Sequence, residues 1–222
     1  MTGLVCLQGG AEFGPACAKV DRLLLERSHA PVVVVPLAVR SGYEFRTTAA
    51  DGVCWYRDLG ADQVSAIPDP RTEPDGLDAA RALLAKAGLV VLPGGSPGRL
   101  LELLATTGLD AVLTDVLARD GTVSGASAGA MVLCEQTIVP EPDPPRLATG
   151  LGIVPGVCVI PHYRGGAPGW LRTIDLPTGI RALGIPECTG VLTDGSEPRW
   201  LGPAPAVFVT ADGATEPLPP LG

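Results

Sequence analysis

Ser127 lies in the middle of the segment 125–129, whose sequence is GASAG. This is the G-x-S-x-G pattern of a nucleophile elbow, in which a serine occupies a tight strand-to-helix turn and small neighbours prevent clashes with the crossing chain. The first turn of the helix offers N–H groups that can stabilise a developing oxyanion. Residues 122–124 have a strand pattern, and 132–134 are expected on the helix. The segment therefore predicts Ser127 as the nucleophile of a serine hydrolase, the alternative being a tight turn around a buried serine.

A serine nucleophile needs a general base, which is most often histidine. The chain contains two histidines, His29 and His162. His29 precedes a run of four valines, so it is expected at the amino-terminal end of a strand, whereas sites in open α/β sheets form at the carboxyl ends. His162 follows the apolar run 157–161 and is expected at the same sheet edge as Ser127. We therefore predict His162 as the base and interpret His29 as a surface or structural residue.

Three residues are candidates for the acid that would orient the histidine. Glu187 follows the apolar run 182–185 and is expected at a strand end, whereas Glu141 and Asp143 lie in a proline-rich surface loop, 140–146. We favour Glu187 and keep Asp143 as the main alternative. The chain order is then serine, histidine, acid. An α/β-hydrolase has serine, acid, histidine, and no histidine follows His162 here, so the esterase and lipase fold is disfavoured.

Gly94 and Gly95 follow an apolar run at 89–92 that we predict as a central strand. Glycines let the backbone approach a reacting group with no side chain in between. The N–H of Gly95 is therefore predicted to form the oxyanion hole together with the N–H of Ala128. Ser96 is expected to cap a helix that starts with Pro97.

The elements that must position these residues alternate along the 222-residue chain as short apolar runs and amphipathic helical patterns, which is typical of β-α-β units. The length fits one domain, residues 1–222. We predict an α/β fold with a doubly wound, mostly parallel sheet flanked by helices and short strands near the C-terminus. Helices are expected at 15–27, 43–59 (with a possible break at Gly52), 75–86, from 97, around 109–117 and at 169–181, and strands at 3–7, 32–36, 63–67, 89–92, 122–124 and 156–161.

Composition argues against several classes of function. The net charge is −8, with 16 Lys+Arg in no basic cluster, so neither a nucleic-acid groove nor an anionic membrane patch is expected. The six cysteines are scattered and only two histidines accompany them, so we expect no metal site and no cofactor. Reduced, buried thiols and the lack of a signal or membrane-spanning pattern indicate a cytoplasmic protein.

Five segments together resemble the peptidase E (aspartyl dipeptidase) and cyanophycinase family of serine hydrolases, and the resemblance covers most of the chain. The elbow segment 124–130 is the most specific match. The family's opening glycine-rich turn is similar to LQGGAE at 7–12, its glycine-pair motif to 93–95 with 100–101, and its histidine segment to 150–156 with 161–163. Its late Gly-Ile-Asp-Glu stretch is similar to 184–187 followed by 189–192.

The resemblance implies a class I glutamine amidotransferase-like fold and a metal-independent triad of Ser127, His162 and Glu187. It implies cleavage of peptide or amide bonds through an acyl-enzyme, in a monomer or homodimer. Peptidase E itself has been associated with an aspartate soon after the serine, a place near Asp143, so the acid stays open. The family commonly has Asn or Asp, then Gln or Thr, after its glycine pair, where Ser96 and Pro97 stand here.

The substrate is accordingly open among an aspartyl dipeptide, a cyanophycin-like isopeptide and another amide or ester. Ser96 stands where the family has a substrate-site residue, and Arg99, Arg164 or Arg172 could bind a substrate carboxylate. An esterase or acyltransferase with the same site, or a binding protein that retains the fold, is the alternative. A glutaminase needs a thiol nucleophile, which Ser127 does not supply.

Overall fold

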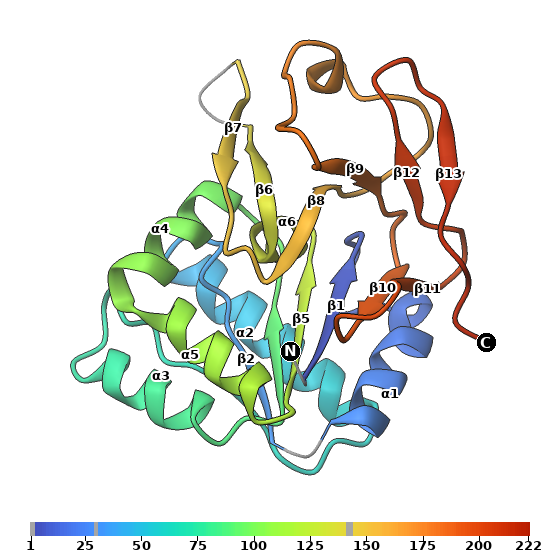
Figure 1. Cartoon of the computed structure of the whole chain (residues 1–222). Coiled ribbons are helices and arrows are strands. Elements are labelled where there is room, and N and C mark those ends of the chain that lie inside the picture. Colours follow the sequence, from blue (N-terminus) through green and yellow to red (C-terminus); the bar gives the residue numbers. More distant parts are fainter. Residues whose placement is uncertain (1–2, 29–30, 141–143) are drawn as a thin grey trace.

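A computed structural model describes residues 3–28, 31–140 and 144–222 of the chain. A seven-stranded sheet has the order β11-β10-β1-β5-β4-β2-β3 (Figure 1). Its strands β1, β5, β4, β2 and β3 are parallel, and β10 and β11 extend it in antiparallel fashion. The bounds are Leu4–Gln8 (β1), Val32–Val34 (β2), Val64–Ala66 (β3), Leu89–Leu92 (β4), Thr122–Ala126 (β5), Gly190–Thr193 (β10) and Arg199–Leu201 (β11).

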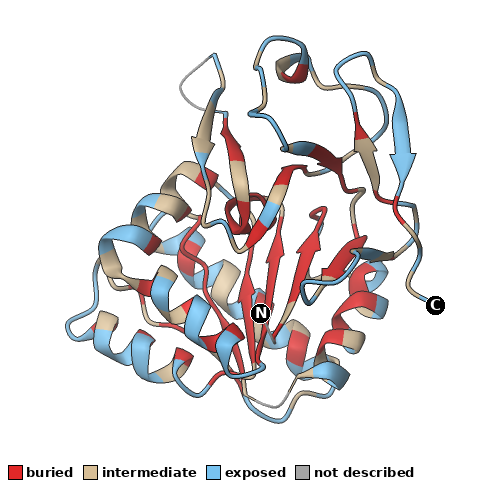
Figure 2. Ribbon diagram, in the orientation of Figure 1, coloured by how far each residue is buried: buried red, intermediate tan, exposed pale blue. Residues whose placement is uncertain are grey.

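Helices cover both faces of this sheet, as the alternation of its side chains requires. Val5 and Leu7 of β1 pack in one apolar cluster with leucines of α3, α4 and α5, whereas Cys6 packs with side chains of α1 and α2 on the other face. Both faces of the central strands are buried (Figure 2). The helices are Ala18–Arg27 (α1, preceded by a 3-10 turn, Pro15–Cys17), Tyr43–Asp58 (α2), Gly76–Leu84 (α3), Pro97–Thr107 (α4), Leu109–Ala118 (α5) and Ala128–Leu133 (α6).

The predicted α/β fold is confirmed, and the elements differ from the expectation in detail. Helix α2 runs through Gly52 without a break, because this glycine is buried against Phe13 and Val34. Ser96 caps α4 as predicted, accepting a hydrogen bond from the Arg99 N–H (3.3 Å), with Pro97 in the first turn. Helix α6 ends at Leu133, so Cys134, expected on this helix, instead begins a strand.

A second sheet of six strands was not predicted. Its order is β13-β12-β9-β8-β6-β7, and it mixes parallel and antiparallel pairs. It stands beyond the carboxyl ends of β1 and β5 (Figure 1). The short C-terminal strands are thus shared between both sheets. The bounds are Cys134–Val139 (β6), Arg146–Thr149 (β7), Val154–Ile160 (β8), Arg181–Gly184 (β9), Val207–Val209 (β12) and Thr215–Pro217 (β13).

The helix predicted at 169–181 is wrong. Only a 3-10 turn forms, at Gly169–Arg172, and residue 181 already belongs to β9. Trp170, Leu171 and Ile174 have helical spacing. Trp170 and Leu171 pack into a small apolar cluster and Ile174 packs against the main core, but Pro177 and Gly179 follow. Proline disrupts a helix interior, and Gly179 has a φ of 91°, so the chain cannot continue as a helix. None of the described helices is long and apolar enough to cross a membrane.

Candidate active site

The turn at Ser127 joins strand β5 directly to helix α6. Ser127 has φ 48° and ψ −111°, a conformation that is costly for a residue with a side chain. A Cβ atom on Gly125 would lie 2.4 Å from the backbone of Gly129, and one on Gly129 would lie 2.0 Å from the carbonyl oxygen of Leu92. Both glycines are therefore required by close backbone contacts, as an elbow predicts.

The structure brings three of the predicted side chains into one hydrogen-bonded chain. The Oγ of Ser127 lies 3.0 Å from Nε2 of His162, and Nδ1 of His162 lies 2.9 Å from Oε1 of Glu187. His162 follows β8 of the second sheet, and Glu187 lies in the turn between β9 and β10. The turn that carries Ser127 thus belongs to the seven-stranded sheet, and His162 follows a strand of the six-stranded sheet.

The Glu187 carboxylate is held in its ionised form. Its hydrogen bond to His162 and the nearby guanidinium of Arg164, whose Nη2 lies 3.5 Å from Oε1, lower the pKa of Glu187 below its ordinary value. Both partners remain accessible, since 45% of the His162 side chain and 41% of the Glu187 side chain are exposed. The alternative acids Asp143 and Glu141, and the other histidine, His29, lie outside the described residues.

Three successive carbonyl groups at the end of β1 anchor the three segments of this chain. The oxygen of Gln8 accepts the N–H of Ser127 (3.0 Å), that of Gly9 accepts the N–H of His162 (2.7 Å), and that of Gly10 accepts the N–H of Cys188 (3.0 Å), next to Glu187. One short backbone stretch therefore sets the relative positions of Ser127, His162 and Glu187.

The two glycines of this stretch are required by their neighbours. A Cβ on Gly10 would lie 2.2 Å from Cε1 of the His162 ring, and Gly10 has a φ of 115°. A Cβ on Gly9 would lie 2.0 Å from the carbonyl oxygen of Pro186. In the sequence, this turn is noticeable only through the family resemblance. A Gly-Gly pair after a strand does not indicate which other segments it will contact.

The second glycine turn, Gly94–Gly95, lies against the elbow. A Cβ on Gly94 would lie 3.2 Å from Cβ of Ser127. Ser96 N–H donates to the carbonyl oxygen of Ala38 (2.9 Å), and Arg99 Nη1 donates to the same oxygen (3.1 Å). The Ser96 Oγ accepts the Arg99 N–H (3.3 Å), so the side chains of Ser96 and Arg99 both have partners within the protein. Arg164 is 83% exposed and forms an ion pair with Glu187.

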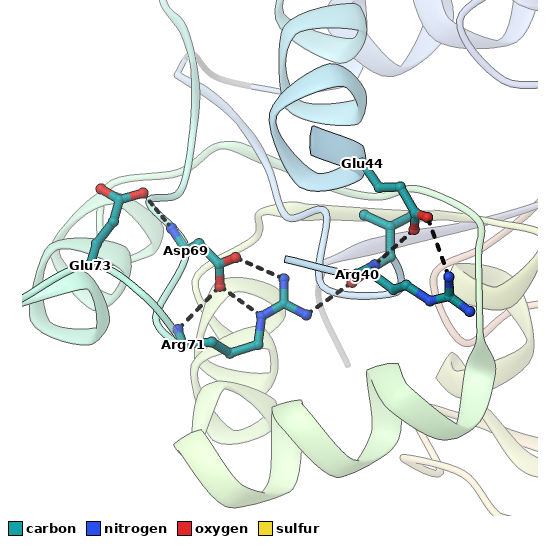
Figure 3. A network of polar contacts seen from close by, with 6 residues as sticks. Arg40, Glu44, Asp69, Arg71 and Glu73 are labelled. Carbon is teal, nitrogen blue, oxygen red and sulfur yellow. Dashed lines mark hydrogen bonds and ion pairs between the residues drawn. The ribbon is translucent and has the colours of Figure 1, made fainter. Parts of the chain in front are cut away.

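A network of charged side chains holds the loop that contains Ala38 (Figure 3). Arg71 Nη1 donates to the carbonyl oxygen of Val39 (2.9 Å), while Nε donates to Asp69 Oδ1 (2.7 Å). Burial raises the pKa of Asp69, but the hydrogen bonds from Arg71 outweigh this effect and the net shift is downward. The network fixes the loop after β2, on which the Gly94–Gly95 turn rests.

Comparison with known proteins assigns the chain to a family. Residues 7–197 match the model of Peptidase family S51. The chain belongs to this family. It is a peptidase, and the resemblance to the peptidase E family is confirmed. No curated protein matches the sequence significantly.

Two solved structures share the fold of this peptidase. A peptidase from an acI-B1 actinobacterium superposes with a TM-score of 0.82 at 24% identity, covering 99% of this chain and 95% of that one. A protein from Listeria monocytogenes EGD-e that is named after peptidase E gives a TM-score of 0.66 at 17% identity, covering 92% and 100%. At these identities the likeness establishes the fold alone.

A buried polar cluster lies beneath the candidate site of the peptidase. The Asp21 carboxylate accepts hydrogen bonds from Gln8 Nε2 (2.9 Å), Trp55 Nε1 (2.8 Å) and the hydroxyl of Tyr56 (3.2 Å), and Gln8 Nε2 also donates to Ser124 Oγ (3.0 Å). Burial raises the pKa of Asp21, although these donors partly oppose the effect. We did not foresee this cluster, because its members are dispersed over 116 residues of sequence.

Proposed function

We propose that this peptidase is a serine hydrolase that cleaves a peptide or isopeptide bond through an acyl-enzyme. The supporting observation is the continuous chain of hydrogen-bonding atoms from Glu187 through His162 to Ser127. In this arrangement Glu187 accepts the Nδ1–H of His162, so Nε2 is left with its lone pair toward the serine hydroxyl. That is the tautomer a general base needs.

Ser127 Oγ attacks the carbonyl carbon of the scissile amide while His162 Nε2 takes the hydroxyl proton. The tetrahedral intermediate collapses as the carbon–nitrogen bond breaks, and the same proton passes from Nε2 to the leaving amine. A water molecule then attacks the acyl-serine ester with His162 again as base, which releases the acid and restores the hydroxyl. Glu187 keeps the imidazole oriented and stabilises the imidazolium, and no metal takes part.

The oxyanion of the intermediate would be bound by the backbone N–H groups of Gly95 and Ala128. Ala128 is the first residue of α6, so its N–H has no acceptor within the helix. Within the described ranges, the Gly95 N–H has no acceptor either. Gly95 has a φ of 139°, which only glycine adopts readily. Two backbone N–H donors without acceptors, close to a nucleophile, are the usual components of an oxyanion hole.

The exposed cation beside the proposed triad supports our proposal for the substrate class. Arg164 is the exposed cation next to the proposed triad, so it is our first choice for binding a substrate carboxylate. Ser96 and Arg99 remain candidates at the rim of the Gly94–Gly95 turn. We therefore propose small acidic peptides or isopeptide-linked acidic residues as substrates.

Labelling with an alkyl fluorophosphonate tests the serine mechanism. The Ser127 oxygen forms a bond to phosphorus, the P–F bond breaks with release of fluoride, and the hydroxyl proton of Ser127 passes to His162. We expect the wild-type protein to be labelled and Ser127→Ala to remain unlabelled, while the matched control Ser65→Ala, on β3 three strands from β5 in the sheet, labels like wild type. Folded wild-type protein that resists labelling, or labelling of Ser127→Ala, would refute the proposal.

Assays with Asp-X dipeptides, a β-Asp-Arg polymer and p-nitrophenyl esters then separate the substrates. Turnover of esters alone would assign the site to an esterase or acyltransferase instead of a peptidase. An Arg164→Ala variant that raises KM for the acidic substrates, while labelling by the uncharged reagent is unchanged, is the expected result for the proposed specificity.

A further inference from the structure

Glu12 lies beside the proposed nucleophile and has no assigned role. Its Oε1 accepts a short hydrogen bond from the N–H of Gly94 (2.6 Å). A Cβ placed on Gly94 would lie 3.0 Å from this oxygen and 3.2 Å from Cβ of Ser127, so the carboxylate and the nucleophile flank the same glycine. Hydrogen bonds to an ionised acceptor are short and strong, which makes this contact a firm anchor.

The backbone around Glu12 is strained on both sides. Ala11 has a φ of 58° and Phe13 a φ of 62°. Ser127, His162 and Cys188, the neighbour of Glu187, also have positive φ values. Residues with side chains rarely adopt a positive φ. Those that do are found preferentially at functional sites. Three of these five residues belong to the candidate triad or adjoin it in sequence, and Glu12 stands between the other two in the chain.

The three consecutive backbone N–H groups of residues 94–96 differ in whether they have a hydrogen-bond acceptor. That of Gly94 is bound by Glu12 and that of Ser96 by the carbonyl oxygen of Ala38. The one between them, that of Gly95, has no acceptor in the described part of the chain. The turn is therefore held at both ends while its middle donor stays available.

We propose that Glu12 is a positioning residue for the oxyanion hole: by holding the Gly94 amide, its carboxylate keeps the Gly95 N–H directed toward the reacting carbonyl. This inference rests on the proposed serine mechanism and adds a residue to it. A hole that is preorganised stabilises the transition state without rearranging during the reaction. Glu12 acts through the backbone and does not touch the substrate.

Three variants separate the acceptor function of Glu12 from its charge. Glu12→Gln keeps an oxygen that can accept from Gly94 and removes the charge. Glu12→Asp keeps the charge but is one methylene too short to reach, and Glu12→Ala removes both. Glu135 provides the matched control, because its Oε2 also accepts a glycine N–H (Gly156, 2.8 Å). Gly156 is near the start of β8, at the far end of this strand from His162.

The readout is saturable labelling by the alkyl fluorophosphonate, which gives a maximal rate and a half-saturating concentration, with thermal unfolding measured in parallel. We expect Glu12→Ala and Glu12→Asp to lower the maximal rate by about 10- to 100-fold, with the half-saturating concentration within about threefold, because misplacing a donor affects the transition state. Glu12→Gln and Glu135→Ala should stay within about threefold of wild type.

Two results would overturn the inference. Wild-type labelling by Glu12→Ala and Glu12→Asp would show that the Gly94 contact is dispensable. Equal losses of the maximal labelling rate in Glu12→Gln and Glu12→Asp would show that the side chain does not act by accepting the Gly94 N–H. Failure of the underlying mechanism is recognised separately, since wild-type protein would then not be labelled or Ser127→Ala would be.

Discussion

Two polar clusters of this peptidase contain a carboxyl group bound to neighbouring donors, and their environments are opposite. In the exposed cluster, formed by Ser127, His162, Arg164 and Glu187, the hydrogen bond with His162 lowers the pKa of Glu187. In the buried cluster, formed by Gln8, Asp21, Trp55, Tyr56 and Ser124, burial raises the pKa of Asp21. Solvent and a nearby cation favour the charged form in the first, and desolvation opposes it in the second.

The difference makes the exposed cluster the better candidate for a reacting site. The carboxylate of Glu187 is ionised, accessible and hydrogen-bonded to an imidazole. Asp21 is 1% exposed, and its oxygens accept hydrogen bonds from side chains of the buried cluster. The clusters nevertheless meet at Gln8, whose side chain binds Asp21 and whose carbonyl oxygen accepts the Ser127 N–H. The buried cluster can therefore support the exposed one through a single strand end.

Among the changes that test the difference between the two clusters, Glu187→Gln in the exposed cluster should have the largest effect on reactivity. Without the carboxylate the imidazole loses the interaction that fixes its tautomer, so we expect labelling and turnover to fall by about 10³- to 10⁴-fold. Thermal unfolding should be almost unchanged because the side chain is exposed. Wild-type rates in this variant would transfer the acid role to Asp143.

A smaller loss is expected from Gly10→Ala, which tests whether the end of β1 sets the geometry of the exposed cluster. The added methyl would overlap the His162 ring, at 2.2 Å from Cε1, and must displace it. We expect the labelling rate to fall by roughly 100-fold, as small misplacements of catalytic groups do. The matched variant Gly14→Ala, whose Cβ meets only the Ala11 oxygen at 3.6 Å, should label like wild type. If both variants label normally, the ring position is not controlled by this turn.

The buried cluster should respond in stability and not in rate. Asp21→Ala leaves the donors of Gln8, Trp55 and Tyr56 without their acceptor, so we expect the free energy of unfolding to fall by about 2–4 kcal/mol. Labelling per folded molecule should stay within about tenfold of wild type. A thousandfold loss in a folded variant would instead make Asp21 part of the reaction machinery.

The pH dependence of that loss has a defined sign. The pKa of Asp21 is raised in the folded protein, so its stabilising contribution is complete below the unfolded value of about 3.9 and is lost as pH rises through the folded pKa. Denaturant unfolding should therefore show a larger penalty for Asp21→Ala at pH 4 than at pH 7. A penalty that grows with pH would contradict the raised pKa.

Patterns within one stretch of sequence were readable without a structure. The elbow at 125–129, the Ser96 cap with Pro97 and the buried strands at 32–34 and 89–92 are local, because their chemistry depends on residues that are neighbours in the chain. The helix expected at 169–181 does not form, because Pro177 and Gly179 interrupt this segment. The second sheet was missed because its strands pair over long distances, which periodicity does not record.

The sequence by itself determined the α/β class and singled out Ser127, His162 and Glu187 as candidates, since residue type and position after a strand carry that information. Only the tertiary structure decided that their side chains meet at 2.9 and 3.0 Å. It also decided that the carbonyls of residues 8–10 anchor all three segments, and that Glu12 holds the Gly94 amide. These contacts join residues up to 178 positions apart (Gly10 and Cys188), and the packing of two sheets, which no single segment encodes, brings them together.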